Sequence, residues 1–242
     1  MSKMMKLIIA VLVVICSFST ILAQEPKSRI ELLRNDFAIF RTNFNENYPS
    51  LYRYANKEDM NLLLDSCYAS INQNTPNLKY YTMLKFILSS IKDGHLYCSM
   101  PPDVESYIEN KAKFFPLGIR FINKRAFILN SVENTVPAGS EIISINGLQV
   151  EAIKTELFKY IASDGNIHTK KNDILNHVFY FYYYLVFGDT DTFDVRFKLK
   201  NGLIRDVMVK SLPEKDFIKK GHTTESKDFL CSSNKRNATF EA

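Results

Sequence analysis

The chain has 242 residues, a formal net charge of +5 and an apolar fraction of 46%, with 13% aromatic residues. A chain of this length forms one or two domains, and its apolar content is enough to bury a core, which excludes a disordered or linker-type protein. The excess of basic residues is mild and they are scattered along the chain, so we expect no nucleic-acid partner. Composition therefore indicates a globular protein and leaves its chemistry open.

The first 23 residues have the pattern of a secretory signal peptide. Two lysines precede an uninterrupted apolar run over residues 7–16, and the small residue Ala23 stands before Gln24. A positive start, an apolar centre and a small residue at the cleavage point are typical of exported proteins. A retained membrane anchor is the alternative, but residues 7–23 are at the short limit for a span. We therefore expect cleavage after Ala23 and a protein without a membrane span, in the periplasm or outside the cell.

The cysteines indicate neither a disulfide framework nor a metal site. After cleavage three remain, Cys67, Cys98 and Cys231, an odd number without regular spacing. Cys67 falls on the apolar face of a predicted helix, where a small buried side chain is the favoured interpretation. We expect no metal and no cofactor.

Three helices are predicted before residue 94. In the first, apolar residues recur at steps of three and four, which is typical of one buried helix face: Ile30, Leu33, Phe37, Phe40 and Phe44. The second begins at the cap residue Asn56, and the third begins with Thr75 as cap and Pro76 as its first residue. Gly94 is expected to end the third helix in the left-handed conformation. Short loops between these helices predict a helical N-terminal domain over residues 24–113.

From residue 114 the period changes to that of strands. Residues 115–122 and 125–129 flank a polar turn, residues 141–145 form a further apolar run, and residues 150–161 have a helical period. Two alternating runs around Asn201-Gly202 predict a hairpin. Residues 177–187 hold seven aromatic side chains, and a buried helix is favoured there over a ligand-stacking site. The fold class expected is α+β, with a helical bundle followed by a β-rich domain with helices over residues 114–212.

Two segments resemble known families. The run Pro137-Ala-Gly-Ser-Glu-Ile-Ile-Ser-Ile-Asn-Gly147 resembles the segment of PDZ domains in which a strand follows a Gly turn and ends in Asn-Gly. The run Leu88-Ser-Ser-Ile-Lys-Asp-Gly-His95 resembles the helix-end Asp-Gly-His motif of tail-specific (C-terminal-processing, tricorn-like) serine peptidases. Secreted Bacteroidetes-type members of that family have the same order of signal peptide, helical domain and PDZ-like domain, followed by an α/β catalytic core. Leu96 departs from the family, which usually has a small hydroxyl residue there.

The resemblance implies two candidate sites. His95 is the candidate general base, and the alternative is a histidine favoured only by the dipole at a helix C-terminus. Leu117, Gly118 and Ile119 are candidates for a PDZ-type loop whose N–H groups hold the carboxylate of peptide or protein C-termini, and the alternative is an ordinary edge strand.

The same resemblance implies a nucleophilic serine on a Gly-rich turn, which this sequence lacks. No glycine follows Gly221, and residues 237–241 look like the first strand of the catalytic core, so we expect residues 213–242 to be a linker and that strand, with the core absent. Two hypotheses remain. The chain is the substrate-handling part of a secreted serine-type peptidase, inactive alone, or it is a non-catalytic PDZ-like peptide-binding module.

Overall fold

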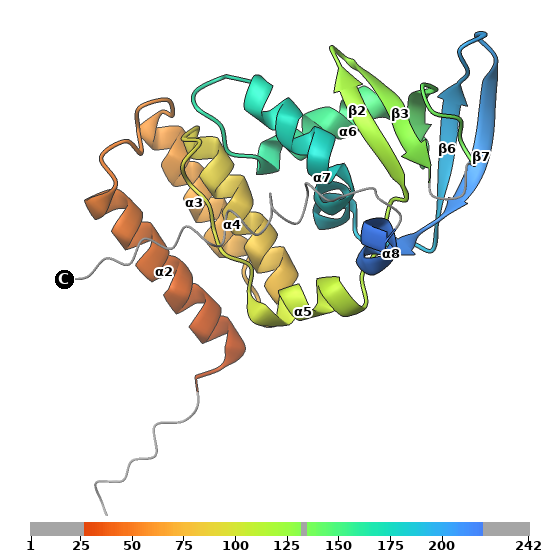
Figure 1. Cartoon of the computed structure of the whole chain (residues 1–242). Helices are drawn as coiled ribbons and strands as arrows, with labels where there is room; N and C mark the ends of the chain where they lie inside the picture. Colours follow the sequence, from red (N-terminus) through yellow and green to blue (C-terminus); the bar gives the residue numbers. More distant parts are fainter. Residues whose placement is uncertain (1–26, 132–134, 220–242) are drawn as a thin grey trace, which may run out of the picture.

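The computed structural model describes residues 27–131 and 135–219 (Figure 1). The expected signal peptide, Cys231 and residues 237–241 lie outside the described residues. The helices are α2 (Arg29–Asn47), α3 (Lys57–Ser70), α4 (Asn77–Ile91), α5 (Pro102–Asn110), α6 (Val150–Leu157), α7 (Thr169–Phe187) and α8 (Glu214–Lys219), with a 3-10 turn η1 (Phe158–Tyr160). The strands are β1 (Lys113–Phe114), β2 (Leu117–Ile122), β3 (Arg125–Ser131), β4 (Glu141–Ile145), β5 (Leu148–Gln149), β6 (Thr192–Lys198), β7 (Ile204–Lys210) and β8 (Leu212–Pro213). The predicted α+β class is confirmed.

The first two helices form where the sequence predicts them. Ser28 caps α2 in a capping box with Glu31, whose carboxylate accepts a hydrogen bond of 2.7 Å from the Ser28 amide. The cap of α3 is Asn56, whose side chain accepts from the amide of Glu58 at 2.7 Å. Their apolar faces meet in a core that also includes part of α4. Cys67 is buried in this core, which confirms its prediction as a small buried side chain.

Helix α4 differs from the expectation at both ends. Pro76 takes the cap position, and the hydroxyl of Thr75 accepts from the amide of Asn72 at 3.0 Å instead of capping the helix. At the other end the left-handed residue is Lys92, with a φ of 60°, and not Gly94. The carbonyl of Lys92 accepts from the amide of Gly165 at 2.9 Å. The predicted cap at Gly94 was therefore wrong. The helix ends two residues earlier, at Lys92, whose carbonyl is bound by a turn far along the chain.

The main sheet is antiparallel throughout, with the strand order β2-β3-β4-β6-β7 and β5 beside β4. Strands β2 and β7 are its edges, and β1 pairs with β8 in a separate small ladder. The predicted hairpin around Asn201-Gly202 is confirmed, and Gly202 has the positive φ of 89° that such a turn needs.

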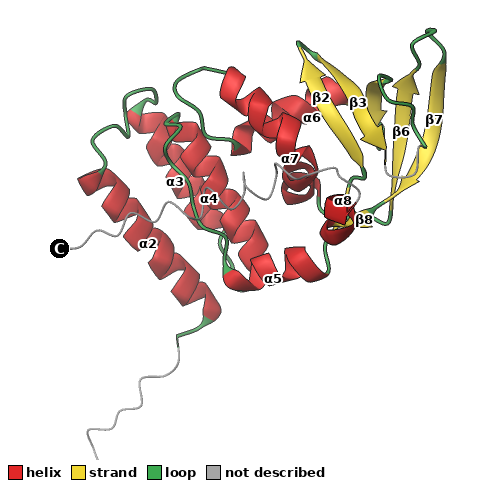
Figure 2. Cartoon of the chain, viewed as in Figure 1, coloured by secondary structure: helices red, strands yellow, loops and turns green. Residues whose placement is uncertain are grey.

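Helix α7 lies between the sheet and the N-terminal helices (Figures 1 and 2). Six of its seven aromatic side chains are buried and Phe187 at its end is exposed, which confirms the predicted buried helix. The ring of Phe179 packs against Phe115 and Phe121 at centroid distances of 5.6 and 5.9 Å. The backbone leaves helical geometry at Val178, where φ is −132° and ψ is 37°. The helix therefore has two halves that meet beside strand β2.

Helix α4 takes part in both hydrophobic cores of the described chain. Tyr81 belongs to the core under the sheet, whereas Ile87 and Ile91 belong to the core of the N-terminal helices. The Ser89 hydroxyl also donates to the carbonyl of Ile161 at 2.9 Å, which ties α4 to the segment after η1. Across residues 27–131 and 135–219, every helix is too short or too polar to cross a membrane.

Candidate active site

His95 stands on the turn that follows α4, and Asp93 lies directly behind it. The Asp93 Oδ1 atom accepts from the His95 amide at 2.8 Å and lies 3.2 Å from the ring nitrogen Nδ1. The His95 side chain is 92% exposed, whereas that of Asp93 is 23% exposed. A ring that donates from Nδ1 to a carboxylate keeps Nε2 as a proton acceptor, so this pair presents the base nitrogen to solvent.

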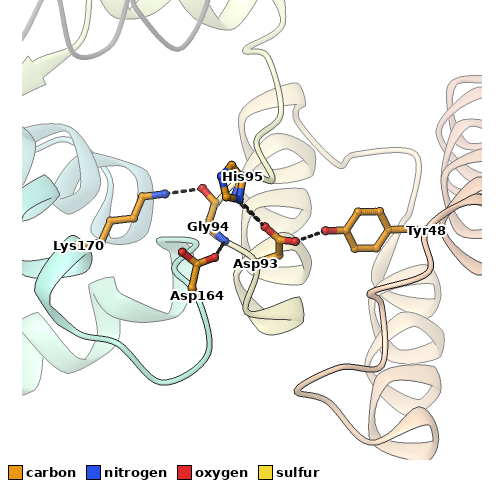
Figure 3. Close-up of polar contacts among 6 residues, drawn as sticks. All are labelled: Tyr48, Asp93, Gly94, His95, Asp164 and Lys170. Carbon is orange, nitrogen blue, oxygen red and sulfur yellow. Dashed lines mark hydrogen bonds and ion pairs between the residues drawn. The ribbon is translucent and has the colours of Figure 1, made fainter.

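Tyr48, from the loop after α2, holds the other oxygen of Asp93. Its hydroxyl donates to Asp93 Oδ2 (Figure 3). This hydrogen bond and the one from the His95 amide lower the pKa of Asp93, so the carboxylate stays charged. Burial, followed by the bond to Asp93, raises the pKa of Tyr48 to about 12, so the hydroxyl keeps its proton. The carboxylate behind His95 is therefore fixed from two sides.

Two residues of the sheet-containing part bracket Gly94 (Figure 3). Its amide donates to Asp164 Oδ1 at 2.8 Å, and its carbonyl accepts from the Lys170 ammonium. A Cβ atom at Gly94 would lie 2.9 Å from Lys170 Nζ and 3.1 Å from both Asp164 carboxylate oxygens. A side chain at this position would make the Lys170 ammonium or the Asp164 carboxylate move, so the glycine allows both to approach the residue next to His95.

The sequence pattern indicated His95 but assigned no role to Asp93, which contacts it, or to three residues that contact Asp93 and Gly94. Asp93 was within reach, because it is part of the quoted motif and two residues away. Asp164 and Lys170 are about 70 residues further along the chain, and Tyr48 is 45 residues before Asp93. No spacing rule joins such distant residues, so only the folded chain brings them together.

Oxygen and nitrogen atoms of Asp93, His95 and Asp164 lie within 4.8 Å of one another, close enough to share one cation. Each carboxylate already accepts hydrogen bonds from the turn, and the Lys170 ammonium lies beside them. These three side chains therefore fit a hydrogen-bonded turn better than the ligand set of a metal ion.

The candidate peptide-binding residues lie in β2, at an edge of the sheet. Leu117 and Ile119 point into the core with exposures of 3% and 2%, and Gly118 faces the side chain of Asn130 on β3. The ladder has an irregularity between Gly118 and Ile119. These residues therefore form an edge strand, and carboxylate binding by them stays a prediction. Helix α7 contacts both candidate sites, through Lys170 at the His95 turn and through Asn176 at β2.

No protein-family model and no curated protein sequence matches the chain. The solved structures similar to it include two of mature CPAF, a chlamydial serine protease of the tail-specific type. The complex of mature CPAF with lactacystin has a TM-score of 0.53 and 12% identity, over 75% of this chain and 35% of that chain. The crystal structure of mature CPAF has a TM-score of 0.50 and 13% identity, over 75% of this chain and 34% of that chain.

At this identity the likeness concerns the fold alone, and the chain spans about a third of the length of these structures. The neighbours fit a distant relationship to proteases and give no support to the Bacteroidetes type expected from the sequence. The chain thus has a fold similar to part of a tail-specific serine protease.

Proposed function

We propose that this chain is the substrate-handling part of an exported serine-type peptidase of the tail-specific kind, in which His95 is the general base. The observation that carries the proposal is the exposed imidazole of His95 with the Asp93 carboxylate 3.2 Å from its Nδ1 atom. A base oriented by a carboxylate is the arrangement that activates a serine hydroxyl. The Bacteroidetes type rests on the order of the sequence motifs alone.

In the proposed reaction, Nε2 of His95 takes the proton of a serine hydroxyl as that oxygen attacks the scissile carbonyl, and returns the proton to the leaving amine. Asp93 keeps the ring in the required tautomer and stabilises the imidazolium. Across the described residues no serine hydroxyl is hydrogen-bonded to the His95 ring. The nucleophile is therefore proposed to come from a segment outside them.

The second part of the proposal is peptide capture at β2. The N–H groups around Leu117, Gly118 and Ile119 are proposed to hold a peptide's C-terminal carboxylate, while the peptide adds as a strand to the free edge. The position of β2 at the end of the strand order supports this role, because an inner strand has no edge to offer.

A non-catalytic PDZ-like peptide-binding module is the second candidate. It is favoured because, in the part of the chain that the structure describes, no serine hydroxyl is hydrogen-bonded to the His95 ring. Both candidate functions include the peptide site at β2. They differ in the role of His95, which is a general base in the peptidase and has no catalytic role in the binding module.

The genomic DNA beyond codon 242 separates the two candidates. A reading frame that continues into a serine on a Gly-rich turn is expected, and the resulting polypeptide should hydrolyse peptides. In that polypeptide His95→Ala should lower kcat by about 10²–10⁴, the usual effect of losing a general base. The control is His168→Ala, since the His168 ring packs on Phe158 at a centroid distance of 5.4 Å. Unrelated DNA after codon 242 would leave only the binding module. Full activity of the His95 variant would instead mean that another residue is the base and that His95 is a residue favoured only by the helix end.

A further inference from the structure

The free edge of β2 presents backbone groups at alternate residues. Ile122 faces Arg125 across the two-residue turn, and Phe121 faces Ala126. Antiparallel pairs alternate between hydrogen-bonded and non-bonded, so the N–H and C=O groups of Phe121 point away from β3. They are the groups that an added strand would pair with.

One of these groups is already occupied. The amide of Phe121 donates to the side-chain oxygen Oδ1 of Asn176, on α7, at 2.7 Å. Asn176 is half-buried, and it comes two residues before the break in α7 at Val178. The side-chain carbonyl of Asn176 thus occupies the position that a backbone carbonyl would take in a strand added beside β2.

The register identifies which peptide residue Asn176 replaces. If a carboxylate is held by the N–H groups of residues 117–119, the last peptide residue lies beside Ile119. Strands pair residue for residue, so Phe121 lies opposite the peptide residue two positions before the last. The carbonyl of that peptide residue and Oδ1 of Asn176 compete for one N–H group.

We propose that Asn176 sets the affinity of the β2 edge, because a peptide binds only when its backbone carbonyl displaces the Asn176 side chain from Phe121. The inference rests on the proposed peptide capture. Displacement needs rotation of one side chain, while the second half of α7 stays fixed by its buried aromatic residues.

The test measures binding of a labelled hexapeptide that ends in valine, with a free carboxylate or as its amide, to the full chain by fluorescence anisotropy. Asn176→Ala should bind the carboxylate form about two- to tenfold more tightly, the equivalent of one net hydrogen bond. The matched control is Asn172→Ala, one turn earlier in α7, where the side chain donates only to the carbonyl of His168 at 3.0 Å. That control should bind as the unaltered chain does.

A second measurement needs no variant. During titration of the unaltered chain with the same peptide, the amide nitrogen signal of Phe121 should shift as its acceptor changes.

Binding of the carboxylate form that is equal in Asn176→Ala and the unaltered chain, or that leaves the Phe121 signal in place, overturns the inference and leaves peptide capture standing. If the unaltered chain and the variant both fail to prefer the carboxylate over the amide, peptide capture itself is wrong, and the inference with it. Binding by Asn176→Ala alone supports both.

Discussion

Asp93 joins Tyr48 to His95 through one carboxylate. Its two oxygens accept from the Tyr48 hydroxyl and from the backbone and ring of His95. The position of the imidazole therefore depends on a tyrosine that lies before α3, far from the quoted sequence motif. This dependence can be measured through the effect of pH on stability, because acid protonates the Asp93 carboxylate while the Tyr48 hydroxyl keeps its proton.

Replacing Tyr48 by phenylalanine should raise the pKa of Asp93, because the bond from the Tyr48 hydroxyl is the largest cause of its lowered value. A carboxyl group with a lowered folded pKa adds stability above its unfolded pKa and loses it as the pH falls through the folded pKa. Urea unfolding should thus show a loss of about 1–2 kcal/mol for Tyr48→Phe at pH 7, shrinking below about pH 4.

The control for this change is Tyr52→Phe, whose hydroxyl donates to the neutral side chain of Asn45 at 2.8 Å. Its effect should be smaller and the same at both pH values. A loss in Tyr48→Phe that is unchanged at pH 3 would contradict the role given to Asp93.

Strands β2 and β3 pack so closely that one added methyl group is expected to disturb them. A Cβ atom on Gly118 would lie 2.1 Å from Oδ1 of Asn130, a buried oxygen without a hydrogen-bond donor in the described structure. The closeness and the unpaired oxygen occur beside the irregular step of the β2–β3 ladder. The two residues should therefore behave as a coupled pair.

Gly118→Ala should lower the free energy of unfolding by about 1–3 kcal/mol, because the short Asn130 side chain has to move out of its place. The double variant Gly118→Ala with Asn130→Ala should recover much of that loss, since the second change removes the obstructing atoms. Chemical denaturation of the single and double variants measures the coupling. Additive losses would mean that the backbone at Gly118, and not the contact with Asn130, sets the cost.

Elements with local signals were predicted from the sequence, and contacts between distant elements were not. The hairpin at Asn201-Gly202 and the cap at Asn56 depend on neighbouring residues, so the pattern sufficed. The end of α4 shifted to Lys92, whose carbonyl pairs with the amide of Gly165, a residue far along the chain. Likewise, the sequence motif held His95 and the Asp93 that contacts its ring, but Tyr48, which donates to Asp93, comes from another element.

Export is expected for the molecule as a whole and has a direct test. The mature protein from its native host should begin at Gln24, because the apolar run is short, positively flanked and followed by a small residue. Mass spectrometry of the N-terminus decides this. Protein that keeps Met1 and sediments with the membranes would show that the leader is an anchor.

Because helix α4 belongs to both cores, it affects how the molecule unfolds and whether it can be divided into fragments. With Tyr81 in one core and Ile87 and Ile91 in the other, unfolding either core removes packing from the other, so the two should melt in a single cooperative transition. Val104 and Ile108, before the expected boundary at residue 113, also belong to the core under the sheet. A fragment cut at that boundary would expose an apolar surface on each piece, and the peptide edge and the His95 turn must be studied in one chain.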